Sequence, residues 1–116
     1  MYIDSFVAPV PKKKLAEYRK LARLAGKVWR EHGALQYVEA VGDDVPKGKV
    51  TSFPLSLKLK PSEVVVVAYV IYKSRKDRDA IMKKVMADPR MKTDPKKMPF
   101  DGKRMFWGGF KPIVEL

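Results

Sequence analysis

The chain has 116 residues, a length that suits one hydrophobic core and leaves little room for a second. Hydrophobic residues make up 46% and charged residues 33%, which is typical of a folded domain and excludes disordered and collagen-like proteins. There is no cysteine, so disulfides, thiolate nucleophiles and cysteine-bound metals are excluded. We therefore expect a single domain over residues 1–116.

The formal net charge is +12 at pH 7, and a charge of this size attracts phosphate backbones and other anions. The basic residues occur in small groups along the whole chain and not in one tract. Two interpretations stay open. The charge either forms a solvated surface, or it supports non-specific binding of nucleic acid or another polyanion, which we rank second.

No segment predicts export or insertion into a membrane. Residues 1–6 lack a basic region followed by an apolar stretch, and the longest apolar run, residues 64–72, is too short to cross a bilayer. We expect a cytoplasmic protein that has no membrane partner.

The first third of the chain predicts a strand, a helix and a second strand. Residues 2–10 are rich in β-branched and aromatic side chains, which favour a strand. Apolar side chains then recur every three or four residues over 12–32, which predicts a helix that ends at Gly33. Gly26 inside this helix costs about 1 kcal/mol relative to alanine and suggests close approach to a neighbouring backbone. Residues 34–41 predict the second strand.

A long connection follows over residues 43–62 and is interrupted by prolines and glycines. Within it Leu55, Leu57 and Leu59 alternate with polar residues, a pattern typical of a short edge strand. Whether this strand belongs to its own subunit or is an arm exchanged with a partner stays open.

The remaining elements are a strand, a helix and a last strand. Residues 64–72 are apolar on both alternating sets, so both faces of this strand need cover. Ser74 has the spacing of a capping residue for a helix that ends before Pro89. After an irregular connection, residues 103–116 predict the last strand, in which Gly108-Gly109 indicates a bulge or a close backbone contact.

This order of elements, β-α-β-β-α-β, predicts an α+β domain of ferredoxin-like type. Its antiparallel sheet has the order 4-1-3-2, with two helices on one face. The third strand is then central, and the two helices leave its second apolar face without cover. A second copy of the chain is the simplest cover, so we expect a homodimer that pairs through the helix-free face.

Four blocks of the chain resemble the uncharacterised bacterial YbaA-like family: WREHGA (29–34), GKVTSFP (48–54), VMADPR (85–90) and MPFDGKRM (98–105). They stand in matching order over nearly the whole chain. The resemblance implies a dimeric α/β-barrel protein of unassigned biochemical role and supplies no catalytic residue. The wider fold group contains both enzymes and other proteins, so enzymatic activity stays open.

One group of candidate site residues lies where the first strand begins and the first helix ends. The topology brings together Asp4, Trp29, His32 and Tyr72. His32 is the only histidine, the one side-chain type whose unperturbed pKa lies near neutrality, and an imidazole is a suitable partner for a buried aspartate. Asp4 and His32 are therefore candidate catalytic residues, unless both only satisfy nearby backbone groups.

A second candidate pair, Asp101 and Arg104, precedes the last strand, where it is either catalytic or a salt bridge that fixes a turn. Three lysines at 12–14 oppose the dipole of the first helix, so they either bind an anion or are solvated. Four aromatic residues are candidates for lining a ligand pocket: Trp29, Phe53, Tyr72 and Trp107.

The sequence contains no histidine or cysteine metal cluster, phosphate-binding glycine loop or nucleophile elbow, so we expect no metal and no cofactor. Our leading hypothesis is a small dimeric α/β-barrel protein that binds or transforms a small organic, anionic molecule between sheet and helices. The alternatives are polyanion binding through the basic surface, and a structural or regulatory dimer without a ligand.

Overall fold

The computed structural model describes residues 1–116 as an α+β domain built on one four-stranded antiparallel sheet. The strands are β1 (Tyr2–Pro11), β2 (Gln36–Val41), β3 (Glu63–Tyr72) and β4 (Phe106–Phe110). Their order across the sheet is β2-β3-β1-β4, and β1 and β3 pair along their whole length. The predicted α+β class and antiparallel sheet are confirmed.

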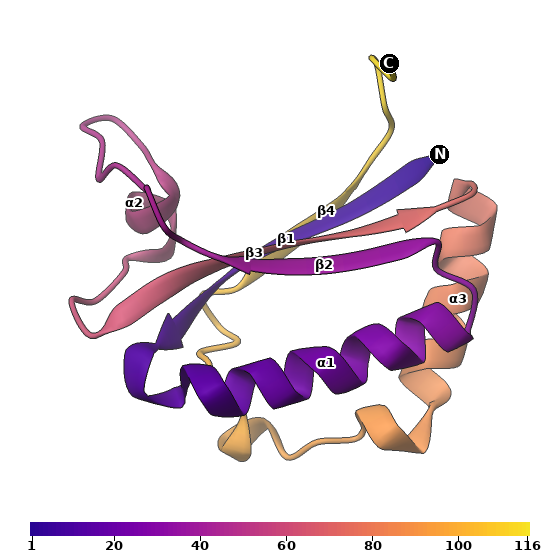
Figure 1. The fold of residues 1–116 in the computed structure, drawn as a ribbon, viewed down its shortest axis with the longest axis horizontal. Helices are drawn as coiled ribbons and strands as arrows, with labels where there is room; N and C mark the ends of the chain where they lie inside the picture. The colour runs from indigo at the N-terminus through magenta and orange to yellow at the C-terminus, as the bar shows by residue number, and fades with distance from the viewer.

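Helices α1 (Leu15–Glu31) and α3 (Arg75–Ala87) lie on one side of the sheet (Figure 1). After α1 the chain turns at Gly33, whose φ of 119° favours glycine, as predicted. Helix α3 starts at the predicted cap, since the Ser74 hydroxyl accepts a hydrogen bond from the Asp77 backbone N–H at 3.1 Å. Neither helix is long and apolar enough to cross a membrane.

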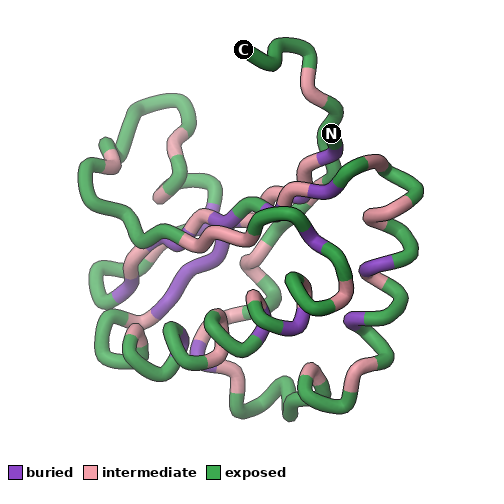
Figure 2. Tube along the Cα trace, turned by 45° about the vertical axis from the view of Figure 1, so that its right-hand side comes forward, coloured by how far each residue is buried: buried purple, intermediate pink, exposed green.

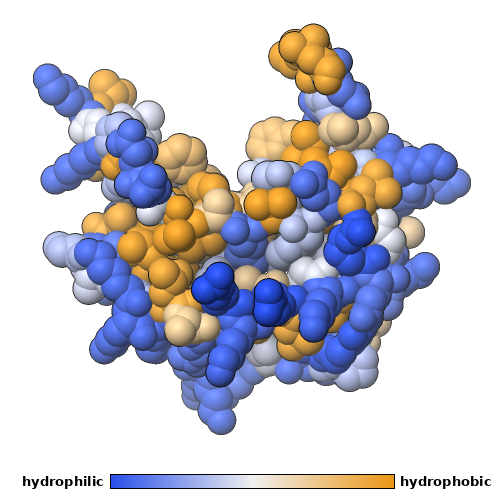
Figure 3. Space-filling view, viewed as in Figure 1, coloured by the Kyte–Doolittle hydropathy of each residue, from blue (hydrophilic) through white to orange (hydrophobic).

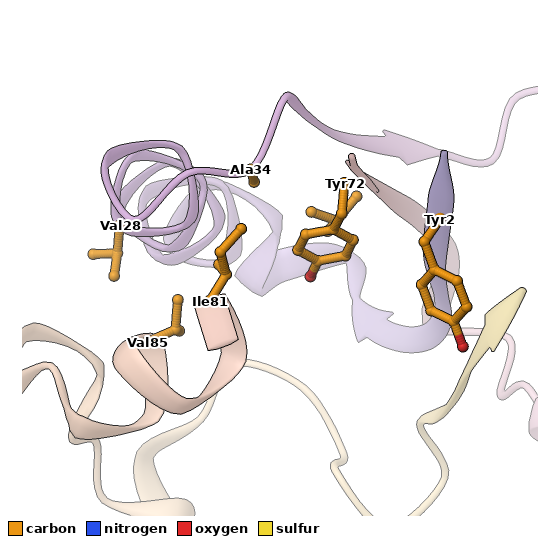
Figure 4. Packing of buried hydrophobic residues seen from close by; sticks show 7 residues of the cluster. Tyr2, Val28, Ala34, Tyr72, Ile81 and Val85 are labelled. Atoms are coloured by element: carbon orange, nitrogen blue, oxygen red, sulfur yellow. The ribbon is translucent and has the colours of Figure 1, made fainter. Parts of the chain in front are cut away.

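The main hydrophobic core lies between the sheet and these two helices. Its buried cluster comprises Tyr2, Val28, Ala34, Val70, Tyr72, Ile81 and Val85. In Figure 4, Ile81 and Val85 of α3 face Val28 of α1, and the tyrosine rings extend from their strands. Burial follows the central strands, whereas the outer surfaces of the helices are exposed (Figure 2).

The connection between β2 and β3 contains a short helix, α2 (Phe53–Leu57), so the predicted edge strand is wrong. The Ser52 hydroxyl accepts a hydrogen bond from the Leu55 backbone N–H at 3.1 Å, and Pro54 occupies the first helical turn. Lys58 then ends the helix in the left-handed conformation, with φ of 49°. These capping interactions override the alternating pattern of leucines.

Helix α2 lies on the side of the sheet opposite α1 and α3 (Figure 1). There Leu57 is fully buried and packs against Val7 and Val65. Farther along the same face of β3, Tyr69 remains 39% exposed. The chain therefore covers part of the second face of β3 by itself and leaves the rest open.

Strand β4 is shorter than the predicted strand over 103–116. Residues 102–104 form a turn, and Pro112 lacks the backbone N–H that an extended ladder needs. Gly109 pairs with Asp4 in a regular register, so there is no bulge. Gly109 does stand at a close approach, but to side chains and not to backbone, because a Cβ at this position would overlap the Tyr2 hydroxyl oxygen.

Gly26 also stands at a close approach, but its neighbour differs from the prediction. A Cβ at this position would lie 2.9 Å from the ring of Tyr37, a side chain and not a backbone. The glycine therefore allows α1 to lie against a bulky side chain of β2.

Candidate functional site

A cavity of about 430 Å³ lies between the sheet and the helices. Its walls come from the sheet, from α1 and α3, and from the connection between α3 and β4, and 16 of its 21 lining residues are hydrophobic. We call it the sheet–helix cavity. Its aromatic walls are formed by Phe6, Tyr18, Trp29, Tyr37, Tyr72, Phe100 and Trp107.

Methionines supply much of the remaining wall. Five of the six methionines in the chain line the cavity, and the sixth is Met1. They are Met82, Met86, Met91, Met98 and Met105. Because methionine is flexible and polarisable, such a wall adapts to apolar molecules of different shape.

A buried carboxylate, that of Asp4, forms one polar part of the wall. Its Oδ1 lies 3.5 Å from the Arg78 Nε and makes no hydrogen bond. Arg78 instead donates a hydrogen bond to the Tyr2 hydroxyl at 3.0 Å. Burial raises the pKa of Asp4 above its ordinary value of 3.8, with Asp79 adding to the rise, whereas the Tyr72 hydroxyl and Arg78 act in the opposite direction.

Trp29 and Tyr72 meet beside this carboxylate. The Trp29 Nε1 donates a hydrogen bond to the Tyr72 hydroxyl at 3.0 Å. Burial and the nearby charge of Asp4 raise the pKa of Tyr72, so its hydroxyl stays protonated and can itself donate. Asp4, Trp29 and Tyr72, which were expected to lie close together, all line the cavity.

His32 does not lie in this cavity, and the expected pairing with Asp4 is wrong. Its Nε2 lies 2.9 Å from Asp88 Oδ2, just beyond the end of α3. Arg90 donates hydrogen bonds to the same carboxylate, and together with His32 it holds the pKa of Asp88 well below its usual range. Arg90 also binds Glu31 at 2.6 Å, so this cluster joins the ends of the two long helices.

Arg104 also lies outside the cavity, where it joins three segments of the chain. It forms a two-point salt bridge with Glu63 at 2.8 and 2.6 Å, and its Nε donates to Asp101 at 2.8 Å. It further donates to the backbone carbonyls of Leu57 and Lys58. Asp101 and Arg104 therefore form a salt bridge at the turn before β4. Phe53 lies on α2, on the other side of the sheet from the cavity.

A second carboxylate in the cavity wall, Glu39, had not been singled out from the sequence. It accepts hydrogen bonds from the hydroxyls of Tyr18 and Tyr37. Burial is the main cause that raises the pKa of both tyrosines, and the charge of Glu39 adds to it. The sequence did contain a signal, because Glu39 is two residues from Tyr37 and therefore lies on the same face of β2. No group of three or more acidic or histidine side chains is arranged to hold a metal ion.

Residues 1–102 match the family described as "Protein of unknown function (DUF1428)". The chain belongs to this family. It is 46% identical over 114 residues to "Uncharacterized protein YbaA" of Escherichia coli (strain K12), which covers 98% of this chain and 97% of that protein. The protein of the same name from Shigella flexneri gives the same values. The resemblance found in the four sequence blocks is confirmed.

The fold is also similar to that of a solved structure, "Crystal structure of an uncharacterized NIPSNAP domain protein from Burkholderia xenovorans". The TM-score is 0.61, and the match covers 98% of this chain and 96% of that chain. With 15% sequence identity, this similarity supports the fold and carries no function.

Proposed function

We propose that the protein binds a small, largely apolar organic molecule in the sheet–helix cavity. The size and composition of the cavity carry the proposal. Protein cores are close-packed and leave few voids larger than a water molecule, whereas ligand sites typically measure about 300–1,000 Å³. A cavity of about 430 Å³ with mostly hydrophobic walls has the size of a ligand site and not of a packing void.

The charges in the wall favour an uncharged ligand over the anion expected from the sequence. The carboxylates of Asp4 and Glu39 would repel an anion in surroundings of low polarity. Arg90 also lines the cavity, but it is already paired with Asp88 and Glu31. We therefore replace the anionic ligand by a neutral one.

The two tryptophans of the chain, Trp29 and Trp107, both line the cavity, so intrinsic fluorescence reports on its occupancy. Titration with p-xylene should change the emission in a saturable manner. Ala22→Phe, which fills the cavity from α1, should abolish the change. Leu24→Phe, on the outer surface of the same helix, is the matched control and should respond like the wild type. Equal responses of both variants would contradict the proposal.

We further propose that the protein is a homodimer in which the helix-free faces of two sheets pack together, as in a dimeric α/β barrel. The strand residues on this face include Ile3, Ser5, Val7, Val38, Ala40, Val67, Tyr69, Ile71, Phe106 and Phe110. None of them is basic, although the chain contains 25 lysines and arginines. An acidic partner would need basic residues here, so an identical apolar face is the better match.

Three exposed aromatic residues on this face add to the argument, with exposed fractions of 39% for Tyr69, 45% for Phe106 and 55% for Phe110. Figure 3 shows hydrophobic side chains on both sides of the hollow between α2 and the C-terminal segment. An exposed apolar surface of this kind is typical of a protein interface. The partner sheet would enter this hollow.

Light scattering at micromolar concentration tests the dimer and should give about twice the chain mass of 13.3 kDa. Tyr69→Glu should yield unfolded or aggregated protein, because it buries a charge in the interface or exposes the apolar face. Leu24→Glu on α1 is the control and should remain dimeric. A wild-type chain that is folded and monomeric under these conditions would exclude the dimer.

Weak polyanion binding remains a second candidate, and one observation favours it. Arg19, Arg23, Lys27 and Arg30 of α1 line an open cleft beside the edge strand β2. None of the four forms a salt bridge in the structure. Arg30 donates hydrogen bonds to the backbone carbonyls of Ala34 and Leu35, whereas Arg19, Arg23 and Lys27 are free to meet a phosphate. Binding of single-stranded DNA should then fall steeply between low and physiological salt, and Arg19→Ala with Arg23→Ala should flatten that dependence. Binding that is insensitive to salt would exclude it.

A further inference from the structure

We infer that the open cleft between α1 and β2 docks an extended, acidic peptide segment of a partner protein. The segment adds to the sheet as a further strand beside β2, and its alternate carboxylates meet Arg19, Arg23 and Lys27. The inference rests on the polyanion binding proposed for this cleft, and it goes beyond that proposal by naming the partner's chemistry and the way it binds.

The first observation is a row of three cations along one face of α1. Arg19, Arg23 and Lys27 are exposed, line the cleft and form no salt bridge. Like charges four residues apart destabilise a helix, so the row does not serve the stability of α1. An anionic partner in the cleft would remove this repulsion.

The second observation is the free edge of β2, which is an outermost strand of the sheet. The Gly42 backbone N–H donates to the Val65 carbonyl at 2.7 Å, and the direction of the backbone groups alternates along an antiparallel pair. Tyr37, Glu39 and Val41 therefore direct their backbone N–H and C=O groups away from β3. Lysine and proline commonly protect such an edge, and β2 contains neither.

The spacing of the row matches the spacing of a strand. Four residues of an α-helix rise about 6 Å, and two residues of a strand rise about 6.7 Å. Helix α1 runs along β2 (Figure 1), and Gly26 lets it lie close, because a Cβ there would lie 2.9 Å from the Tyr37 ring. Alternate side chains of an added strand would therefore meet Arg19, Arg23 and Lys27 in turn.

The cleft favours a peptide over a nucleic acid. Sites for single-stranded nucleic acid supply aromatic side chains on which the bases stack. The one aromatic residue in the cleft wall, Tyr37, packs against Trp29 and donates its hydroxyl proton to Glu39. A peptide backbone can continue the sheet at β2 by main-chain hydrogen bonds, whereas an oligonucleotide cannot.

The other charges around the cleft leave room for an acidic segment. Two carboxylates line it, and both are already bonded: Glu31 by Arg90, and Glu39 by two tyrosine hydroxyls. The dimer face proposed above uses Val38 and Ala40 on the other side of β2. A peptide at the edge and a second subunit on the face can therefore be bound together.

Two probes of equal charge test the inference at low salt. One is a capped nonapeptide in which four glutamates alternate with three threonines between terminal glycines, and the other is a thymidine pentanucleotide, which carries four phosphates. The wild type should bind the peptide at least about tenfold more tightly, because backbone hydrogen bonds add to the attraction of the charges. With the peptide bound, amide hydrogen exchange followed by NMR should slow at Tyr37, Glu39 and Val41.

A matched pair of variants locates the site. Arg23→Glu reverses the middle charge of the row, and Lys20→Glu makes the same change of net charge on α1 outside the cleft. Because the charge at position 23 meets the peptide directly, Arg23→Glu should weaken peptide binding roughly threefold or more relative to Lys20→Glu.

Equal or tighter binding of the pentanucleotide would overturn the inference and leave polyanion binding standing. Peptide binding without slower exchange at the three amides of β2 would overturn it as well, because the peptide would then not extend the sheet. Equal losses in Arg23→Glu and Lys20→Glu would place the binding outside the cleft and also overturn it. If neither probe binds at low salt, both the inference and the proposed polyanion binding fail.

Discussion

The salt bridge of Arg104 offers a sharp test of how this fold is held together, because one side chain joins the start of β3, the end of α2 and the turn before β4. The side chains of Arg104 and Glu63 are only 18% and 6% exposed. Arg104→Ala leaves the Glu63 carboxylate buried, with the backbone N–H of Lys60 as its remaining donor at 2.8 Å. Breaking a buried pair in this way costs about 3–5 kcal/mol. Since Lys60 still donates, we expect about 3 kcal/mol.

Urea unfolding at pH 7, followed by circular dichroism, measures this loss as a lower midpoint at an unchanged slope. The double variant Glu63→Gln with Arg104→Ala should recover part of the loss, because it no longer buries a charge. Arg75→Ala, whose side chain is 72% exposed and lies 3.9 Å from Asp79, is the surface control and should change little. A loss below about 1 kcal/mol for Arg104→Ala, or no recovery in the double variant, would refute this reasoning.

Three further predictions concern the Glu63 carboxylate, Gly109 and Leu57. The hydrogen bond from Arg104 is the main cause that lowers the pKa of Glu63 below its ordinary value of 4.5. The ionised pair therefore stabilises the folded protein above pH 4.5, and this stabilisation is lost as the pH falls through the lowered pKa. On acidification, Glu63→Gln should lose less stability than the wild type. Gly109→Ala should displace Arg78 and raise the pKa of Asp4 further, which carboxyl NMR detects, and overpacking should cost about 1–3 kcal/mol. Leu57→Ala should cost about 2–5 kcal/mol in urea unfolding, because it opens a space beneath α2.

Hydrophobic periodicity was sufficient to predict β1, β3 and the two long helices, since each of those segments has ten residues or more. It failed at α2, where three alternating leucines occupy only five positions and local capping by Ser52 decides the conformation. It also overextended the last strand, although Pro112 stood in the sequence as a signal for its end.

The candidate site was predicted in part. The topology correctly gathered Asp4, Trp29 and Tyr72, because strand ends and helix ends fix positions along the sheet. It paired His32 with Asp4 and did not consider Asp88, the carboxylate that follows α3 and that His32 contacts in the structure. Glu39 was missed because a single acidic residue in a strand does not reveal which side chains face it.

The basic row on α1 was missed for another reason. Arg19, Arg23 and Lys27 are four residues apart, so they share one face of the helix although they are not adjacent in the sequence. The sequence analysis considered only basic residues that are adjacent in the chain, so it missed that these three side chains lie on one face of α1.

The most direct test of the ligand cavity uses the methionine methyl groups as reporters during a titration with 4-ethylphenol. Five methionines line the cavity and Met1 does not, so the chain contains its own control. We predict saturable shifts of the signals of Met82, Met86, Met91, Met98 and Met105, with the Met1 signal unmoved. Shifts of all six signals in proportion, or of none, would contradict the existence of a binding site between the sheet and the helices.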